Sequence, residues 1–182
     1  MATRRPEPYL TYEDYVHFPE GQRWELLDGE AFVIASPTAR HQDIALRLAR
    51  VVADHLDVHG GGRVFIAPFD VVLSPGDVVQ PDVVFISDAR MDVLTEANVW
   101  GTPDWAVEVL SDPHRDRELK RQRYANARIP EYWIIDPDTD RVEIYRLSGG
   151  SYPDPEVAGP PATVSPGVLP GLRIELAALL RR

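Results

Sequence analysis

The sequence predicts a mixed α/β (α+β) fold, in which a central mixed β-sheet is flanked by helices. Apolar residues recur at three- and four-residue spacing in one long segment, as they do in an amphipathic helix. Several short apolar runs are bounded by Gly, Pro and Asp, a pattern typical of β-strands. The chain has 182 residues and shows no internal repeat, so we expect a single domain over residues 1–182.

The N-terminal part of the chain predicts a short helix followed by a β-hairpin. Thr11 is a suitable helix cap, acidic residues follow it, and the helix is expected to end near Pro19. The apolar runs 24–27 and 31–35 flank Asp28-Gly29, and Asp-Gly is a strong signal for a tight hairpin turn. We therefore expect these two runs to pair as an N-terminal β-hairpin.

Two further helices are expected. The first begins at about Thr38 and ends at Gly60-Gly61-Gly62. Its apolar face is formed by residues spaced three and four apart, namely Ile44, Leu48, Val51, Val52, His55 and Leu56. The second covers residues 114–127, with Asp112-Pro113 as its cap and first position.

Strands and a C-terminal extension account for the rest of the chain. Strands are expected at 63–67, 69–73, 78–86, 105–110, 132–135 and 142–147. Beyond Ser148 the chain is rich in Pro and Gly. We expect this extension, 148–182, to pack back on a core of about residues 9–147, with a short strand and a helical turn over 172–180.

Composition excludes several classes of protein. The absence of cysteine excludes disulfides, thiol catalysis and Cys-ligated zinc, and it suits a reducing cytoplasm. Residues 1–6 do not resemble a secretory signal, and no run approaches the ~18 apolar residues of a membrane helix. The formal net charge of −10 argues against non-specific binding to nucleic acid. Residues 111–130, however, form one clearly basic stretch that could supply a local binding surface.

Two carboxylates, Asp82 and Glu108, lie inside apolar runs that are expected to be strands. Charged groups are rarely buried unless they are paired or bind a metal ion, so these side chains need a partner. Carboxylate oxygens suit Mg²⁺ or Mn²⁺. Such an ion could lower the pKa of a bound water and offset charge on a phosphoryl oxygen. The pattern therefore predicts a metal-dependent site that cleaves phosphodiesters.

Lys120 is the only lysine among the 19 basic residues of the chain. Its ammonium group is a compact point charge that could orient a water or stabilise developing negative charge. On the helix expected over 114–127, Asp116, Lys120 and Tyr124 share one face. An alternative is that Asp116 and Lys120 form only an i,i+4 ion pair worth roughly 0.3–0.5 kcal/mol, with Tyr124 in the core.

Several motifs occur together in a characteristic order. They are Trp24–Glu30, Ser36-Pro37-Thr38 with His41, Val78–Asp82, Val107–Ser111 followed by Asp116, Lys120 and Tyr124, and Pro130–Pro137. Their joint order and spacing resemble the Uma-two family, mostly bacterial proteins proposed to be endonucleases, within the PD-(D/E)XK nuclease superfamily. The likeness spans about residues 9–147, and the tail segment Leu169-Pro170-Gly171-Leu172 also fits it.

The resemblance implies a restriction-endonuclease-like core and a nuclease that acts on nucleic acid, foremost DNA. It implies Asp82 and Glu108 as ligands of Mg²⁺ (or Mn²⁺), with the main-chain carbonyl of Val109 as a third ligand. The superfamily usually has a lysine two residues after the glutamate, where this chain has Leu110. The lysine would instead come from the following helix, as Lys120. Because both strands of a duplex must be cut, such nucleases often act as dimers, so a homodimer is one expected assembly.

Four residues are candidates for accessory roles. Gln80 could touch a phosphate or a metal-bound water, or could be a plain polar neighbour of Asp82. His41 could face the site, or could serve as a cap or surface residue. Of the two hairpin glutamates, Glu25 and Glu30, one could approach the metal ion, and we expect Glu30; Tyr124 is the fourth. The alternative function is a binding module with little or no catalysis on a nuclease-like scaffold, in a defence or mobile-element context.

Overall fold

A computed structural model of the chain describes residues 8–182. Residues 1–6, which the sequence indicates are not a secretory signal, lie outside the described residues. The N-terminal part forms the short helix α1 (Tyr12–Tyr15) and the hairpin of β1 (Arg23–Leu27) and β2 (Glu30–Ile34), close to the predicted bounds. The hairpin belongs to a five-stranded sheet in the order β2-β1-β5-β4-β7, with β4 (Val71–Ser74), β5 (Asp77–Val79) and β7 (Val99–Trp100). No helix among the described residues is long and apolar enough to span a membrane.

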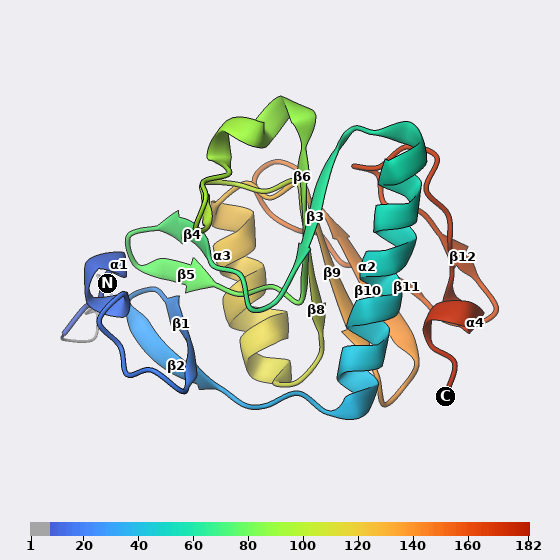
Figure 1. The fold of residues 1–182 in the computed structure, drawn as a ribbon. Coiled ribbons are helices and arrows are strands. Elements are labelled where there is room, and N and C mark those ends of the chain that lie inside the picture. Colours follow the sequence, from blue (N-terminus) through green and yellow to red (C-terminus); the bar gives the residue numbers. More distant parts are fainter. Residues whose placement is uncertain (1–7) are drawn as a thin grey trace.

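A second sheet of six strands forms the centre of the molecule (Figure 1). Its order is β11-β10-β9-β8-β6-β3, with β3 (Gly62–Ile66), β6 (Val83–Ser87), β8 (Trp105–Val109), β9 (Glu131–Asp136), β10 (Arg141–Arg146) and β11 (Glu156–Ala158). Strands β8 and β9 are parallel and the other pairs are antiparallel. Helix α2 (Ala39–His59) covers one face and α3 (Arg121–Asn126) the other, which confirms the predicted mixed sheet flanked by helices.

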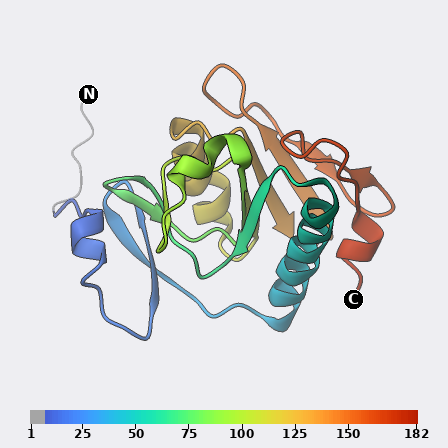
Figure 2. The same cartoon turned by 45° about the horizontal axis from the view of Figure 1, so that its top comes forward.

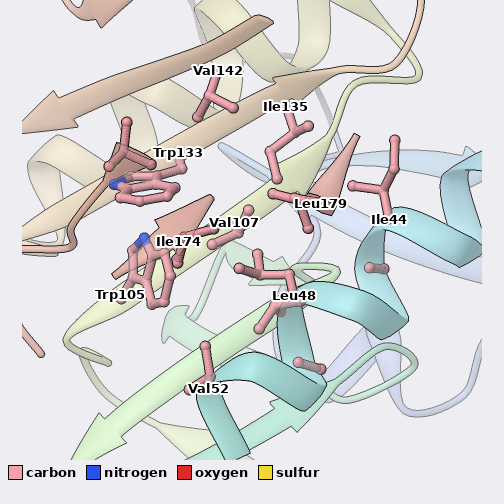
Figure 3. Packing of buried hydrophobic residues seen from close by; sticks show 14 of the residues in the cluster. Ile44, Leu48, Val52, Trp105, Val107, Trp133, Ile135, Val142, Ile174 and Leu179 are labelled. Atoms are coloured by element: carbon pink, nitrogen blue, oxygen red, sulfur yellow. The ribbon is translucent and has the colours of Figure 1, made fainter. Parts of the chain in front are cut away.

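The alternation of side chains along β8 explains why both faces of this sheet are covered. Trp105, Val107 and Val109 point toward α2 and pack in one apolar cluster with Ile44 and Leu48 of that helix (Figure 3). The intervening Ala106 belongs to the cluster under α3 on the opposite face. Both faces of β8 are therefore buried, which explains its near-continuous apolar sequence.

The C-terminal extension contributes to the α2 side of the core. It contains β12 (Thr163–Val164), β13 (Ile174–Glu175) and α4 (Leu176–Leu179), and α4 lies beside α2 (Figure 2). Seven of its buried apolar side chains belong to the same cluster as Val107 of β8 and Ile44 of α2: Val164, Leu169, Leu172, Ile174, Leu176, Leu179 and Leu180. Strand β13 and helix α4 contribute Ile174, Leu176 and Leu179 to this cluster, while β7, β11, β12 and the 3₁₀ segment η1 (Asp88–Val93) were not predicted.

The predicted strand over 78–86 is wrong in one respect, because the structure divides it into β5 and β6. The break lies at Gln80-Pro81-Asp82, where Pro81 has no backbone N–H to donate to a strand ladder. Since β5 belongs to the five-stranded sheet and β6 to the six-stranded sheet, this segment connects the two sheets. Asp82 therefore lies in the link between the sheets, immediately before β6, and not inside a strand.

The helix predicted over 114–127 has an irregular first half. Residues Arg115–Lys120 (η2) form a π-helix, and the regular helix α3 follows directly. Asp112 accepts a hydrogen bond from the backbone N–H of Arg115 (3.0 Å), so its predicted role as a cap is present. π-Helical turns within helices occur frequently at functional sites. Lys120 is the last residue of this turn, which makes its surroundings a natural place to look for a site.

The Asp28-Gly29 turn of the hairpin depends on glycine. Both residues have positive φ angles, 53° and 75°, as a two-residue type I′ turn requires. A Cβ atom on Gly29 would also collide with the ring of Tyr9. The hairpin therefore needs glycine at position 29 for both backbone and steric reasons.

We expect Gly29→Ala to lower the free energy of unfolding by more than the ~1–2 kcal/mol that a positive φ costs an alanine. Gly21→Ala is the matched control, because Gly21 has a φ of 88° but no atom lies within 4 Å of its added Cβ. Urea denaturation of the two variants separates backbone strain from the collision with Tyr9. Equal losses in the two variants would contradict a steric contribution.

Candidate active site

Five of the residues that the sequence singled out, His41, Gln80, Asp82, Glu108 and Lys120, line one cavity at the junction of the two sheets. The cavity has a volume of about 320 Å³. Its walls come from β1, the start of α2, the link between β5 and β6, the end of β8 and the π-helical turn, and they include Arg23, Glu25, His41, Gln80, Asp82, Glu108, Leu110, Arg115 and Lys120. Asp82 and Glu108 lie on adjacent elements because β6 and β8 pair directly, with Val83 opposite Val107.

Lys120 is buried and contacts two carboxylates at hydrogen-bond distance. Its Nζ lies 2.8 Å from Oε1 of Glu25 and 2.9 Å from Oε1 of Glu108. The i,i+4 partner Asp116 is farther away, at 3.9 Å. Tyr124 is also fully buried, and its hydroxyl donates to Oε1 of Glu108 (2.7 Å). The alternative, an Asp116–Lys120 ion pair alone, therefore does not describe this lysine, whereas its placement of Tyr124 in the core is confirmed.

Burial and neighbouring charges act in opposite directions on the pKa of Lys120, and the pKa values of both Glu108 and Lys120 are raised. Loss of solvent raises the pKa of Glu108 well above its usual range, although the charge of Lys120 opposes the rise. The nearby carboxylates of Asp82, Asp116 and Glu25 add to it. Burial alone would lower the pKa of Lys120, but Glu108, Glu25 and Asp116 more than offset that effect and raise it. Lys120 is therefore a permanent cation and cannot serve as a general base at neutral pH.

The raised pKa of Glu108 makes the stability of the metal-free protein depend on pH. Between the ordinary and the raised pKa the folded state binds the proton more tightly than the unfolded state, so stability falls as pH rises through this window. Each pKa unit corresponds to about 1.4 kcal/mol. We expect Glu108→Gln to flatten this fall, as measured by urea denaturation in EDTA at pH 5 and pH 8. An unchanged pH slope would show that Glu108 is not the group responsible.

Asp82 is oriented from two sides. Its Oδ2 accepts a hydrogen bond from the backbone N–H of Val109 (2.8 Å) and lies 3.1 Å from Nε2 of His41. His41 is in the first turn of α2, where Thr38 caps the helix by accepting from the His41 backbone N–H (3.2 Å). The imidazole of His41 thus faces the site and is not a surface group. Val109 contacts Asp82 through its N–H, while its carbonyl as a metal ligand stays a prediction.

The other accessory candidates have different positions. Gln80 lines the cavity, but its side-chain amide donates to Asp70 Oδ1 (2.8 Å) and to the Tyr15 hydroxyl (3.2 Å). Of the two hairpin glutamates, Glu30 is exposed and does not line the cavity, whereas Glu25 is buried in it. The hairpin carboxylate at the site is therefore Glu25, and the expectation for Glu30 is not met by its position.

Sequence reasoning assigned no individual role to three charged residues of the cavity wall, namely Arg23, Arg115 and Asp138, and it named Glu25 only as the alternative to Glu30. Glu25 carried the same signal as Asp82 and Glu108, a carboxylate within an apolar run, here Trp24 to Leu27. Arg115 belongs to the basic stretch 111–130, which was expected to offer a binding surface. Instead the cations of this stretch mostly pair with acids: Arg115 with Glu25 and Asp116, Arg117 with Asp136 and Glu143, Lys120 with Glu25 and Glu108, and Arg123 with Asp28.

The chemistry of the cavity fits a divalent cation. Within residues 8–182 no group of three His, Asp or Glu side chains is arranged as a complete metal site. Mg²⁺, however, is commonly held by one or two carboxylates and keeps several waters. The lining of the cavity has more acidic than basic side chains, which leaves an excess of negative formal charge; the acids are Glu25, Asp82, Glu108 and Asp138, and the bases are Arg23, Arg115 and Lys120. Oε2 of Glu25 is buried without a hydrogen-bond partner, so the protein alone does not satisfy this site.

Comparison with solved structures identifies the fold. The chain resembles the crystal structure of a protein from Anabaena variabilis described as "a putative nuclease belonging to DUF820", with a TM-score of 0.79 and 20% identity. The match covers 94% of this chain and 97% of the other. The fold is therefore restriction-endonuclease-like, as the resemblance implied.

The sequence places the chain more narrowly. Residues 6–177 match the family Uma2, described as "Putative restriction endonuclease", and the chain belongs to this family. It is also 28% identical over 148 residues to the uncharacterized protein slr1290 of Synechocystis, covering 77% of this chain and 75% of that protein. The resemblance drawn from the motifs is thereby confirmed.

Proposed function

We propose that this protein is a metal-dependent endonuclease that hydrolyses phosphodiester bonds, foremost in DNA. One observation carries the proposal: a single cavity brings together two carboxylates, Asp82 and Glu108, and the only lysine of the chain. Membership of the Uma2 family and the restriction-endonuclease-like fold support the same reaction. The excess of acidic side chains in the cavity lining supports a divalent cation as the cofactor.

Six residues at or beside the cavity have roles in this proposal. Asp82 and Glu108 would hold Mg²⁺ or Mn²⁺, which when bound lowers the pKa of a water and offsets charge on the phosphoryl oxygens. Lys120, as a permanent cation, orients the nucleophile or stabilises the developing negative charge. Glu25 and Tyr124 position Lys120 and Glu108 through their contacts, and His41 positions Asp82.

The proposal is tested by incubating the protein with supercoiled plasmid, single-stranded DNA and RNA in Mg²⁺, Mn²⁺ or EDTA. We expect nicking that requires the divalent ion and that survives in Glu30→Gln, because Glu30 is exposed and outside the cavity. If linear plasmid forms while only a small fraction of the plasmid has been nicked, this would favour a homodimer that cuts both strands. A folded protein that cuts none of these substrates but still binds them would instead support the alternative, a binding module on a nuclease-like scaffold.

A further inference from the structure

Arg23 occupies an unusual position beside the candidate active site. A second, smaller cavity of about 170 Å³ adjoins the first, and it is lined by Gln42, Asp43, Ala45, Leu46, Ile66 and Ala67. Arg23 and Asp82 line both cavities. These two side chains, one basic and one acidic, therefore stand where the cavities meet. A ligand that extends from one cavity into the other would have to pass them.

The side chain of Arg23 is held by a network of hydrogen bonds. Its Nε donates to Oε1 of Gln80 (2.9 Å), and the amide nitrogen of Gln80 donates to Asp70 and Tyr15. The backbone N–H of Gln80 donates to Oε1 of Glu25 (2.8 Å), the same oxygen that contacts Lys120. Gln80 thus fixes Arg23 relative to the candidate catalytic lysine, which explains a polar residue at this buried position.

The guanidinium of Arg23 has donors to spare. Among the residues that the structure describes, only Gln80 forms a hydrogen bond with this side chain, and no carboxylate forms an ion pair with it. Arg115, the other arginine of the main cavity wall, lies between the carboxylates of Glu25 and Asp116. Since Nε of Arg23 is occupied, its two terminal nitrogens form the fork that matches two oxygens of a phosphate.

We propose that Arg23 binds the phosphate at the point where a nucleic-acid strand passes between the two cavities, opposite Asp82, and that Gln80 is its positioning residue. This inference rests on the proposed function. It adds the residue that recognises the substrate, which neither the motifs nor the family description assigns. It also explains how an acidic protein can bind a polyanion at a cavity rich in carboxylates: the strand meets one oriented, unpaired guanidinium.

The test measures binding and turnover of a fluorescent single-stranded oligonucleotide by wild type, Arg23→Gln and Arg63→Gln. Arg63 is the control because it is exposed on β3 and lines neither cavity. Binding is followed by anisotropy in EDTA at several salt concentrations, and kcat and KM are measured in Mg²⁺. We expect Arg23→Gln to weaken binding on the order of ten-fold. We also expect it to reduce the slope of log K against log salt by about 0.7, the value of one phosphate contact on a single strand.

The variants also separate the role of Arg23 from a structural one. Arg23→Lys keeps the charge but loses the fork, so it should lie between wild type and Arg23→Gln in affinity and recover most of the salt slope. Thermal unfolding checks that each variant is folded. If Arg23→Gln does not fold, the affinity and salt slope of Arg23→Lys test the inference instead. The inference alone would be overturned if wild type cuts the oligonucleotide and a folded Arg23 variant has the same affinity, salt slope and KM as wild type. A folded wild type that cuts plasmid but neither binds nor cuts the oligonucleotide would overturn this inference alone, and one that cuts no DNA or RNA substrate would overturn the proposed function as well.

Discussion

Lys120→Ala is expected to abolish nicking and to destabilise the fold more than any other single change in the cavity. Its Nζ contacts Glu25 and Glu108 at 2.8 and 2.9 Å, and all three side chains are buried. Removing one partner of a buried ion pair costs about 3–5 kcal/mol, because it leaves charge uncompensated. Loss of an oriented cation that stabilises the transition state lowers kcat by about 10²–10³. Urea denaturation and plasmid nicking measure the two effects.

Two further variants separate charge from geometry at this position. Arg50→Ala is the control for stability, because the Arg50–Asp54 pair is exposed and such pairs contribute about 0–1 kcal/mol. Lys120→Arg keeps the positive charge but replaces a compact ammonium with a larger planar fork in a fully enclosed place. We expect it to fold better than Lys120→Ala and still to lose most of its nicking. Full activity in Lys120→Arg would show that the lysine is not chemically special.

The candidate site residues that the sequence singled out carried two different signals. Asp82 and Glu108 are charged residues inside apolar runs. Because burying a charge is costly, a carboxylate in such a run indicates a paired or metal-binding side chain. Lys120 was conspicuous because arginine supplies every other basic side chain. The direct pairing of β6 with β8, which brings Asp82 close to Glu108, depends on strand order. Strand order follows from tertiary packing, and the local periodicity of the sequence does not predict it.

What the sequence did not reveal depends on contacts between distant segments. Arg23 is a charged residue at the start of a strand, and nothing local distinguishes it from a surface arginine. Its role arises because the hairpin pairs with β5, which delivers Gln80 to its side. The break at Pro81 was visible in the sequence, but its effect, the passage of the chain from one sheet to the other, required the structure. Local sequence propensity predicts most of the helices and strands, whereas the packing of the two sheets brings the residues of the candidate site together.

Asp82→Asn is expected to remove metal binding while it leaves the fold largely intact. Asparagine keeps an oxygen that can accept from the Val109 N–H, so the hydrogen bond that orients this side chain survives. The change removes one negative charge from a cavity whose carboxylates outnumber its cations. A divalent ion at 100 times its Kd should stabilise wild type by about 2.7 kcal/mol. That stabilisation should be absent in Asp82→Asn.

Thermal unfolding with and without Mn²⁺ measures this loss directly and needs no substrate, so it tests the metal site independently of any nuclease assay. Nicking by Asp82→Asn should fall at least about 100-fold, since a bound ion contributes several kcal/mol of charge stabilisation in the transition state. Glu30→Gln removes a carboxylate from the exposed end of the hairpin and should retain both properties. If Mn²⁺ shifts the melting temperature of Asp82→Asn as much as that of wild type, the ion binds elsewhere and Asp82 is not its ligand. Because Glu25 is also buried in this cavity with one unpartnered oxygen, a residual shift would be traced with Glu25→Gln.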